Sequence, residues 1–195
     1  MGIPLGSPDK HYTYGDYKTC PEDERRELIE GTAWDMSPAP NRCHQEIFGE
    51  LFRQIGNFLE NNPCKVYAAP FDVLLPGPGE YKEDDVSTVV QPDISVICDA
   101  GKLTDKGCTG APDWIIEILS PNTSKKDFSI KFNLYQNRGV KEYWIADPGN
   151  KYIHVYHLDY KGNYQKEPEV FIVGDSIERG VIKGLVIKLE RVFKE

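Results

Sequence analysis

The feature that most constrains the fold is an apolar run with one charged residue inside it, Trp114-Ile115-Ile116-Glu117-Ile118-Leu119. A short continuous apolar run of this kind is typical of a strand buried on both faces of a sheet. A carboxylate at such a place costs free energy unless it is paired, protonated or bound to a cation. Glu117 is therefore either satisfied by an arginine or by backbone amides, or it is a metal-binding or acid–base carboxylate.

Other strands are predicted around this run. They cover residues 66–75 and 91–98 before it, and a hairpin of residues 142–147 and 152–158 after it. Residues 26–36 predict two short strands that turn at Gly31. The chain from residue 159 to Glu195 alternates short β-like runs with glycine turns.

Two amphipathic helices are predicted between the strands. In residues 43–61 the apolar side chains fall on one arc at helical spacing, and His44 lies near the centre of that arc. The second helix, residues 124–138, has Ser124 as its expected N-cap and Gly139 as the residue that ends it. Strands around two helices predict an α/β or α+β fold with a mixed sheet.

The second helix carries two charges on its apolar side. The arc of apolar residues consists of Phe128, Phe132, Leu134 and Tyr135. Asp127 and Lys131 lie inside this arc, one turn apart, so we expect Lys131 to point toward the sheet. The alternatives are a snorkelling lysine or a simple pair with Asp127. We expect Phe128, Phe132 and Leu134 to be buried and the opposite side, Lys125 and Asn133, to be exposed.

Asp93 opens the predicted strand at residues 91–98, where an aspartate after Pro92 also suits a turn. Together, Asp93, Glu117 and Lys131 suggest a site that holds a divalent cation. Mg²⁺ prefers oxygen ligands and keeps several waters, and a bound metal lowers the pKa of its water. A lysine stabilises negative charge that develops on a reacting oxygen. We therefore expect these three side chains to converge.

Length and charge bound the remaining possibilities. The chain has 195 residues, which predicts one domain over residues 1–195 with a polar lead-in at about residues 1–20. Its net charge of −8 disfavours an extended basic surface for nucleic acid.

No membrane span or secretory signal is expected. Five cysteines without a C-x-x-C motif disfavour a disulfide framework and predict a cytoplasmic protein whose cysteines are small hydrophobes.

Several stretches in order resemble the Uma-two family, an uncharacterised bacterial family of the PD-(D/E)XK, restriction-endonuclease-like superfamily. They lie between residues 27 and 156: residues 27–31, 36–44, 91–96, and Glu117-Ile118-Leu119-Ser120-Pro121-Asn122-Thr123 with Asp127 and Lys131. The last runs from Tyr135 through Gly139-Val140-Lys141-Glu142-Tyr143-Trp144 to Pro148.

The resemblance implies a restriction-endonuclease-like fold, with a central mixed sheet flanked by helices. It also implies a nuclease that hydrolyses DNA phosphodiester bonds with Mg²⁺ or Mn²⁺, held by Asp93 and Glu117. The superfamily lysine two residues after the glutamate is replaced by Leu119, so Lys131 is implied as its migrated equivalent. The accessory candidates are Glu27, His44, Asp127 and Tyr135. His44 is either a core histidine or a catalytic one, and Tyr135 either donates to a site residue or only packs.

Two functions remain open at this point. The first is a metal-dependent DNA endonuclease. The second is a non-catalytic interaction or regulatory protein that keeps the nuclease fold and pairs as a homodimer. Retention of three charged residues favours the nuclease, because an inactive scaffold tends to lose buried charges that cost stability. If the nuclease is correct, Lys131→Met is expected to keep the fold and remove most of the activity.

Overall fold

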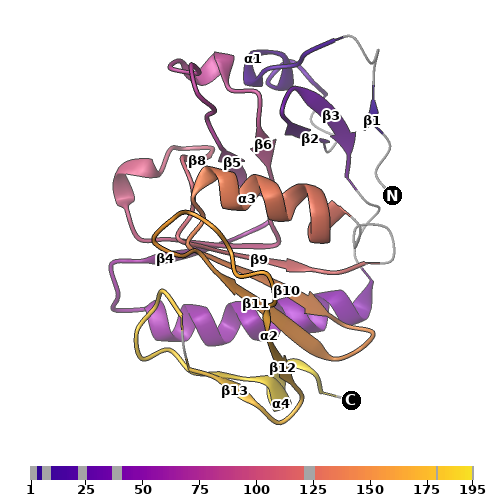
Figure 1. Ribbon diagram of the computed structural model, residues 1–195, viewed down its shortest axis with the longest axis vertical. Helices are drawn as coiled ribbons and strands as arrows, with labels where there is room; N and C mark the ends of the chain where they lie inside the picture. Colours follow the sequence, from indigo (N-terminus) through magenta and orange to yellow (C-terminus); the bar gives the residue numbers. More distant parts are fainter. Residues whose placement is uncertain are drawn as a thin grey trace.

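A mixed six-stranded sheet between two helices forms the centre of the computed structural model (Figure 1), which describes residues 4–5, 10–21, 26–36, 41–120, 126–178 and 180–194. The strand order is β12-β11-β10-β9-β7-β4. Their bounds are β4 (Lys65–Ala68), β7 (Ile94–Ile97), β9 (Trp114–Ile118), β10 (Glu142–Asp147), β11 (Tyr152–His157) and β12 (Glu169–Ile172). Within this sheet β9 and β10 run parallel, and the other neighbours run antiparallel. The predicted α/β architecture with a mixed sheet is confirmed.

The two helices cover opposite faces of this sheet. Helix α2 (Arg42–Leu59) packs on the face that carries Ile116 and Ile118, and α3 (Phe132–Arg138) packs on the face that carries Ile115. Because successive strand residues alternate between faces, Glu117 shares the α3 face with Ile115. The expected burial of this strand on both faces is confirmed, since all of β9 is buried.

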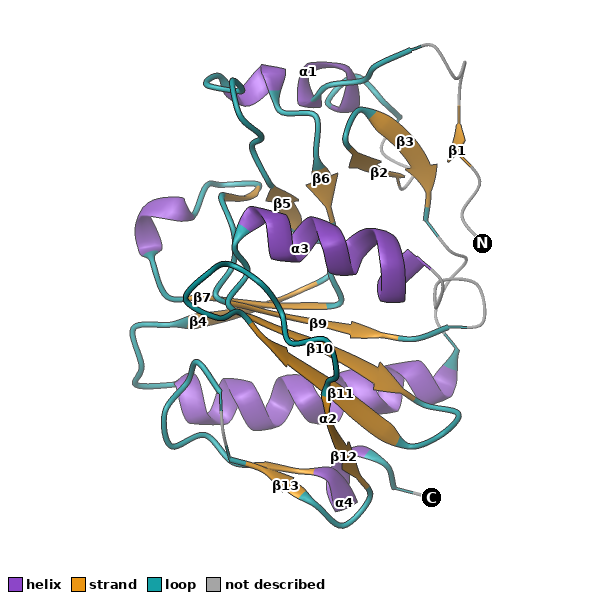
Figure 2. Cartoon of the chain, in the orientation of Figure 1, coloured by secondary structure: helices purple, strands orange, loops and turns teal. Residues whose placement is uncertain are grey.

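A second six-stranded sheet lies on the other side of α3, above it in Figure 2. Its order is β1-β3-β2-β6-β5-β8. The bounds are β1 (Pro4–Leu5), β2 (Arg26–Ile29), β3 (Thr32–Asp35), β5 (Asp72–Leu74), β6 (Val89–Val90) and β8 (Gly107–Thr109). Ile29, Val73 and Val90 of this sheet share one hydrophobic cluster with Leu134 and Tyr135 of α3. Helix α3 is therefore enclosed between two sheets.

One predicted strand is divided between the two sheets. Residues 66–75 were expected as a single strand, but β4 pairs in the first sheet and β5 in the second. The break falls at Pro70, which has no N–H for a ladder and interrupts strand pairing. By contrast, the predicted hairpin at residues 26–36 is confirmed, with Gly31 at φ +76° in its turn.

Short elements complete the described chain. They are α1 (Tyr14–Tyr17), η1 (Glu83–Asp85), η2 (Ala100–Lys102), β13 (Ser176–Ile177), β14 (Ile187–Lys188) and α4 (Leu189–Val192). Tyr14 is buried in a cluster with Leu28 and Val89, so part of the expected lead-in is packed onto the second sheet. None of the helices that the structure describes is long and apolar enough to cross a membrane.

The second predicted helix begins differently from the expectation. A π-helix, η3 (Lys126–Lys131), runs directly into α3, and the expected N-cap Ser124 lies outside the described residues. Gly139 ends the helix in the left-handed region, as predicted. In a π-helix the hydrogen bonds join residues i and i+5, so the buried face is shifted relative to an ordinary α-helix.

This shift corrects one part of the burial prediction. Leu134 is buried and Asn133 is exposed, as expected, and Phe132 is partly buried. Phe128 was expected to be buried but is 37% exposed. The buried stripe is instead centred on Asp127 and Lys131, whose charges find partners in the interior.

The cysteine prediction is wrong for one pair. In the antiparallel register of β4 and β7, Lys65 faces Ile97, so Cys64 and Cys98 come to lie opposite each other just beyond these strands. They form a disulfide, with an S–S distance of 2.03 Å. This pairing depends on strand register, which the cysteine spacing does not reveal. Cys108 is buried as a free thiol, whereas Cys43 is exposed.

The packing of α2 generates a stability prediction. Leu51 is fully buried against the central sheet, so Leu51→Ala is expected to lower the free energy of unfolding by about 2–5 kcal/mol. Phe58 on the same helix is 39% exposed, and Phe58→Ala is expected to cost less than about 1 kcal/mol. Urea denaturation of both variants measures the difference. Equal losses would contradict the orientation of α2.

Candidate active site

Two carboxylates lie side by side where β7 begins and β9 ends. Ile94 pairs with Ile116 in the antiparallel ladder, which places Asp93, just before β7, opposite Glu117. The backbone N–H of Ile118 donates to Asp93 Oδ2 at 2.7 Å and holds the aspartate in this position. Glu117 is 5% exposed.

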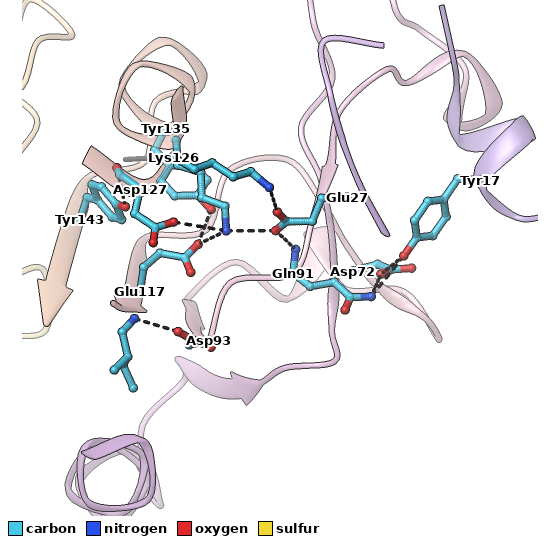
Figure 3. A network of polar contacts seen from close by, with 12 residues as sticks. Tyr17, Glu27, Asp72, Gln91, Asp93, Glu117, Lys126, Asp127, Tyr135 and Tyr143 are labelled. Carbon is cyan, nitrogen blue, oxygen red and sulfur yellow. Dashed lines mark hydrogen bonds and ion pairs between the residues drawn. The ribbon is translucent and has the colours of Figure 1, made fainter. Parts of the chain in front are cut away.

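Lys131 reaches this pair from the last residue of η3. Its Nζ lies 2.7 Å from Glu117 Oε1 and 3.0 Å from Glu27 Oε1, as Figure 3 shows. Asp127, one turn earlier, lies farther away, at 3.9 Å. The structure therefore brings Asp93, Glu117 and Lys131 together, and the ammonium points into the interior instead of snorkelling to solvent.

Two tyrosine hydroxyl groups donate to acidic residues of the site, one to a carboxylate and one to a backbone carbonyl. The Tyr135 hydroxyl donates to Glu117 Oε1 at 2.8 Å, so it does more than pack. The Tyr143 hydroxyl donates to the backbone carbonyl of Asp127 at 3.1 Å. Among the described residues, the partners of Glu117 are thus a lysine and a tyrosine, in place of the arginine or backbone amides that the sequence left open.

Glu27 joins the site from the second sheet and is 2% exposed. Its Oε1 accepts from the backbone N–H of Gln91 at 3.1 Å, and its Oε2 pairs with the ammonium of Lys126. That ammonium also lies 5.4 Å from the centre of the Trp34 ring. Glu27 therefore links two lysines, since Lys131 approaches its other oxygen.

Lys126, Gln91 and Trp34 are site neighbours that the sequence did not single out. Lys126 precedes Lys131 by five residues, which is the repeat of a π-helix and not of an α-helix. An α-helical wheel therefore places the two lysines on different faces, and only the π-helical segment brings both to Glu27.

The polar contacts continue from Glu27 toward the N-terminal part of the chain. The Gln91 side chain donates to Asp72 Oδ1 at 2.8 Å, and the Tyr17 hydroxyl donates to the same oxygen at 3.0 Å (Figure 3). Burial, together with the charge of Asp72, raises the pKa of Tyr17. This chain of contacts connects α1 to the site.

His44, from the first turn of α2, lies on the other side of Asp93. Its Nε2 is 3.2 Å from Asp93 Oδ2, and its side chain is 12% exposed. Its Nδ1 has no hydrogen-bond partner within the described part of the chain. His44 therefore orients Asp93 and is not merely a core residue.

The electrostatics of the site distinguish the two buried glutamates. Burial raises the pKa of Glu117 to about 8, and the neighbouring Asp127 and Asp93 add to this effect against the pull of Lys131. Burial also tends to raise the pKa of Glu27, but the charges of Lys131 and Lys126 together outweigh burial and lower the pKa of Glu27 to about 2. Burial alone lowers the pKa of Lys131, but its carboxylate neighbours raise it well above its usual value. The site therefore favours the charged forms of Lys131 and Glu27 and disfavours the charged form of Glu117.

A divalent cation such as Mg²⁺ needs oxygen ligands from the protein. Across the described ranges, no three His, Cys, Asp or Glu side chains are arranged to hold a metal ion. Asp93 Oδ1 and Glu117 Oε2 accept no hydrogen bond from described residues, and they belong to adjacent carboxylates. Two carboxylates suit Mg²⁺, which binds few protein ligands and keeps several waters.

The charge balance agrees with this fit. Among the described residues, the contacting groups comprise four carboxylates, those of Asp93, Glu117, Glu27 and Asp127, and two ammonium groups, those of Lys126 and Lys131. When all are ionised, two negative charges remain uncompensated among these groups. A divalent cation neutralises that excess.

The family model described as "Uma2: Putative restriction endonuclease" matches residues 14–188. The chain belongs to the Uma2 family. It is 24% identical over 163 residues to "Uncharacterized protein slr1290" of Synechocystis sp., which covers 83% of this chain and 79% of that protein. A crystal structure of "a putative nuclease" from Anabaena variabilis is similar in fold, with a TM-score of 0.71 and 22% identity. That match covers 93% of this Uma2 chain and 97% of the other chain.

The raised pKa of Glu117 predicts how the stability of this Uma2 protein depends on pH. A carboxyl group that is harder to ionise in the folded state contributes stability below its unfolded pKa of about 4.3, and this is lost as pH rises to about 8. Glu142, with a pKa raised by burial to about 7, acts in the same direction but at lower pH. Between pH 7 and 8 the slope therefore comes mainly from Glu117.

We expect Glu117→Gln to flatten this part of the profile. Urea denaturation in EDTA measures the free energy of unfolding at pH 7 and at pH 8. For the wild type we expect it to fall by up to about 1.4 kcal/mol between these pH values, and for the variant we expect this fall to be absent. Glu142→Gln serves as the control and keeps the slope. An unchanged slope in Glu117→Gln would show that this carboxyl group ionises elsewhere. Glu27 acts with the opposite sign, and its contribution disappears only as pH falls toward 2.

Proposed function

We propose that this Uma2 protein is a Mg²⁺-dependent nuclease that hydrolyses DNA phosphodiester bonds at Asp93, Glu117 and Lys131. The observation that supports this most is the buried ammonium of Lys131, held 2.7 Å from Glu117 beside a second carboxylate, Asp93, whose Oδ1 accepts no hydrogen bond from the described residues. A buried charge cluster of this kind is costly for a fold that does not use it. Mn²⁺ is expected to substitute for Mg²⁺, since it too favours carboxylate and water ligands.

Asp93 Oδ1 and Glu117 Oε2, which accept no hydrogen bond from the residues that the structure describes, are the proposed metal ligands. When bound there, the cation supplies Lewis-acid polarisation of the phosphoryl oxygen and a bound water of lowered pKa. His44 and the Ile118 N–H orient Asp93, and Tyr135 orients Glu117. These are positioning residues, because they act through the carboxylates.

Lys131 is the proposed catalytic cation. An ammonium group has three N–H donors, and Glu117 and Glu27 accept two of them. The third is left to donate to the attacking water or to a phosphoryl oxygen, where negative charge develops. The contacts of Glu27 with Lys126 and with Gln91 keep that carboxylate, and so the lysine, in place.

The second candidate is an interaction or regulatory protein that keeps the nuclease fold and pairs as a homodimer. The net charge of −8 favours it, because an acidic surface steers DNA poorly. The two functions differ in a direct assay, since only the nuclease cleaves a strand in a metal-dependent way.

Cleavage assays test the nuclease. The full-length protein is expected to cut DNA with Mg²⁺ or Mn²⁺ but not with EDTA, and Lys131→Met is expected to reduce the rate about 100-fold or more. Because Lys131 is buried between carboxylates, this variant is also expected to lose about 3–5 kcal/mol of stability, contrary to the expectation from sequence. The rates are therefore compared at a temperature where circular dichroism shows both proteins folded.

Lys141→Met is the matched control, since the Lys141 side chain is 64% exposed and pairs with Asp113, outside the contacts of the candidate site. It is expected to cleave within about two-fold of wild type, because Lys141 contacts none of the proposed catalytic or metal-binding residues within the described part of the chain. Cleavage by Lys131→Met at the wild-type rate would show that the lysine is not catalytic. Absence of metal-dependent cleavage of DNA and RNA by the wild type would favour the interaction protein.

Metal binding supplies an independent prediction. Glu117 must lose its proton to act as a ligand, so Mg²⁺ affinity is expected to rise with pH up to about 8 and each binding event to release a proton. Calorimetry in two buffers of different ionisation enthalpy measures that proton. Glu117→Gln is expected to abolish the pH dependence and weaken binding. Equal affinity at pH 6 and pH 8 in the wild type would contradict Glu117 as a ligand.

A further inference from the structure

Phe128 is a large apolar side chain that stays at the surface next to the candidate site. Its neighbour Asp127 is 2% exposed and belongs to the site, whereas Phe128 is 37% exposed. The helical pattern placed this ring in the buried arc, so its exposure is unexpected for a core residue. An exposed ring beside a cluster of charged groups is suited to contact a ligand.

Phe128 is one end of a row of three rings, which we name the aromatic shelf: Phe128, His154 and Tyr152. The ring centres of Phe128 and His154 are 5.7 Å apart with the planes at 67°. Those of His154 and Tyr152 are 4.5 Å apart and nearly parallel, at 18°. His154 and Tyr152 lie two residues apart on β11, so they share a face of the sheet, and both are partly exposed.

Strand register places the aromatic shelf beside the carboxylates. Ile145 of β10 pairs with Glu117 on one side and with His154 on the other. Directly paired residues point to the same face, and neighbouring strands are about 4.8 Å apart, so Glu117 and His154 stand about 10 Å apart along the sheet. Stacked nucleotides rise about 3.4 Å each, so a short stretch of strand spans this distance.

We propose that the aromatic shelf stacks unpaired bases of a nucleic-acid strand whose phosphate lies at the candidate site. This inference rests on the proposed function and names its substrate class, single-stranded or locally unpaired nucleic acid. Every base offers a π-face, so stacking on aromatic rings needs neither sequence nor a basic surface. Within a duplex the bases stack on one another and their faces are not available.

The charge of the chain favours this mode of binding. A net charge of −8 makes long-range attraction of phosphates weak, so affinity must come mainly from short-range contacts. Ring stacking is such a contact, because it depends on the fit of two faces and little on the sign of the surrounding charge.

Binding measurements with Phe128→Ala test the proposal. The probe is a short fluorescein-labelled DNA strand, followed by anisotropy in EDTA so that no strand is cut. The same sequence is used as a duplex, as RNA, and with one abasic position. Phe128→Ala is expected to weaken single-strand binding about ten-fold, whereas Phe128→Tyr, which keeps a ring, stays within about two-fold of wild type.

Phe58→Ala is the matched control, because Phe58 is 39% exposed but lies on α2, across the central sheet from η3. It is expected to bind like the wild type. An abasic site at the position whose base stacks on the shelf is expected to weaken wild-type binding and to have little further effect in Phe128→Ala, since both changes remove the same contact. Comparison of the DNA and RNA strands shows which of the two the shelf accepts.

Several results would overturn the aromatic shelf. The first is that the wild-type protein binds no single strand. The second is that Phe128→Ala binds the single strand with an affinity within two-fold of wild type. The third is that Phe128→Ala loses as much affinity for the duplex as for the single strand. The outcome is separable from that of the proposed function. If the protein cleaves but Phe128→Ala binds like the wild type, the nuclease proposal stands and the shelf proposal is wrong. If binding depends on Phe128 but no metal-dependent cleavage occurs, the shelf proposal stands and the nuclease proposal is wrong.

Discussion

The ammonium of Lys131 between Glu117 and Glu27 is the contact on which the rest of the site depends. It joins a strand of the central sheet, a strand of the second sheet and the helical segment enclosed between them. Charges this far from water are tolerated only when each finds a partner at close range. The position of η3 between the two sheets therefore follows from electrostatics as well as from the apolar contacts of α3.

The same contact divides two buried glutamates into different roles. Glu27 lies between two lysines and stays ionised, with its pKa lowered to about 2, although burial opposes this. Glu117 is penalised by burial and has further carboxylates beside it, so its pKa rises to about 8. Paired carboxyl groups with such different surroundings are typical of active sites. In the proposed nuclease Glu27 orients the lysine, while Glu117 exchanges its proton for a metal.

Local patterns were sufficient to predict much of this architecture. A continuous apolar run identified β9, two strand-like segments around a turn identified the hairpin of β10 and β11, and helical spacing identified α2, because burial imposes such patterns directly on the sequence. The charges that interrupt the patterns, in particular Glu117 and Lys131, identified side chains that the structure brings together. Their catalytic roles stay predictions. The prediction that Phe128 is buried was wrong because it used α-helical spacing where the chain forms a π-helix.

By itself, the sequence determined which charged residues stand among apolar neighbours where a strand or helix is predicted to be buried. Asp93, Glu117, Asp127 and Lys131 could all be recognised in this way, since the cost of burying a charge is a property of the residue and its neighbours along the chain. Only the tertiary structure decided which distant groups satisfy them. Glu27 with Lys126, and Cys64 with Cys98, meet through sheet order, strand register and the π-helical turn. These depend on packing energies summed over the whole fold, and no local pattern in the sequence records them.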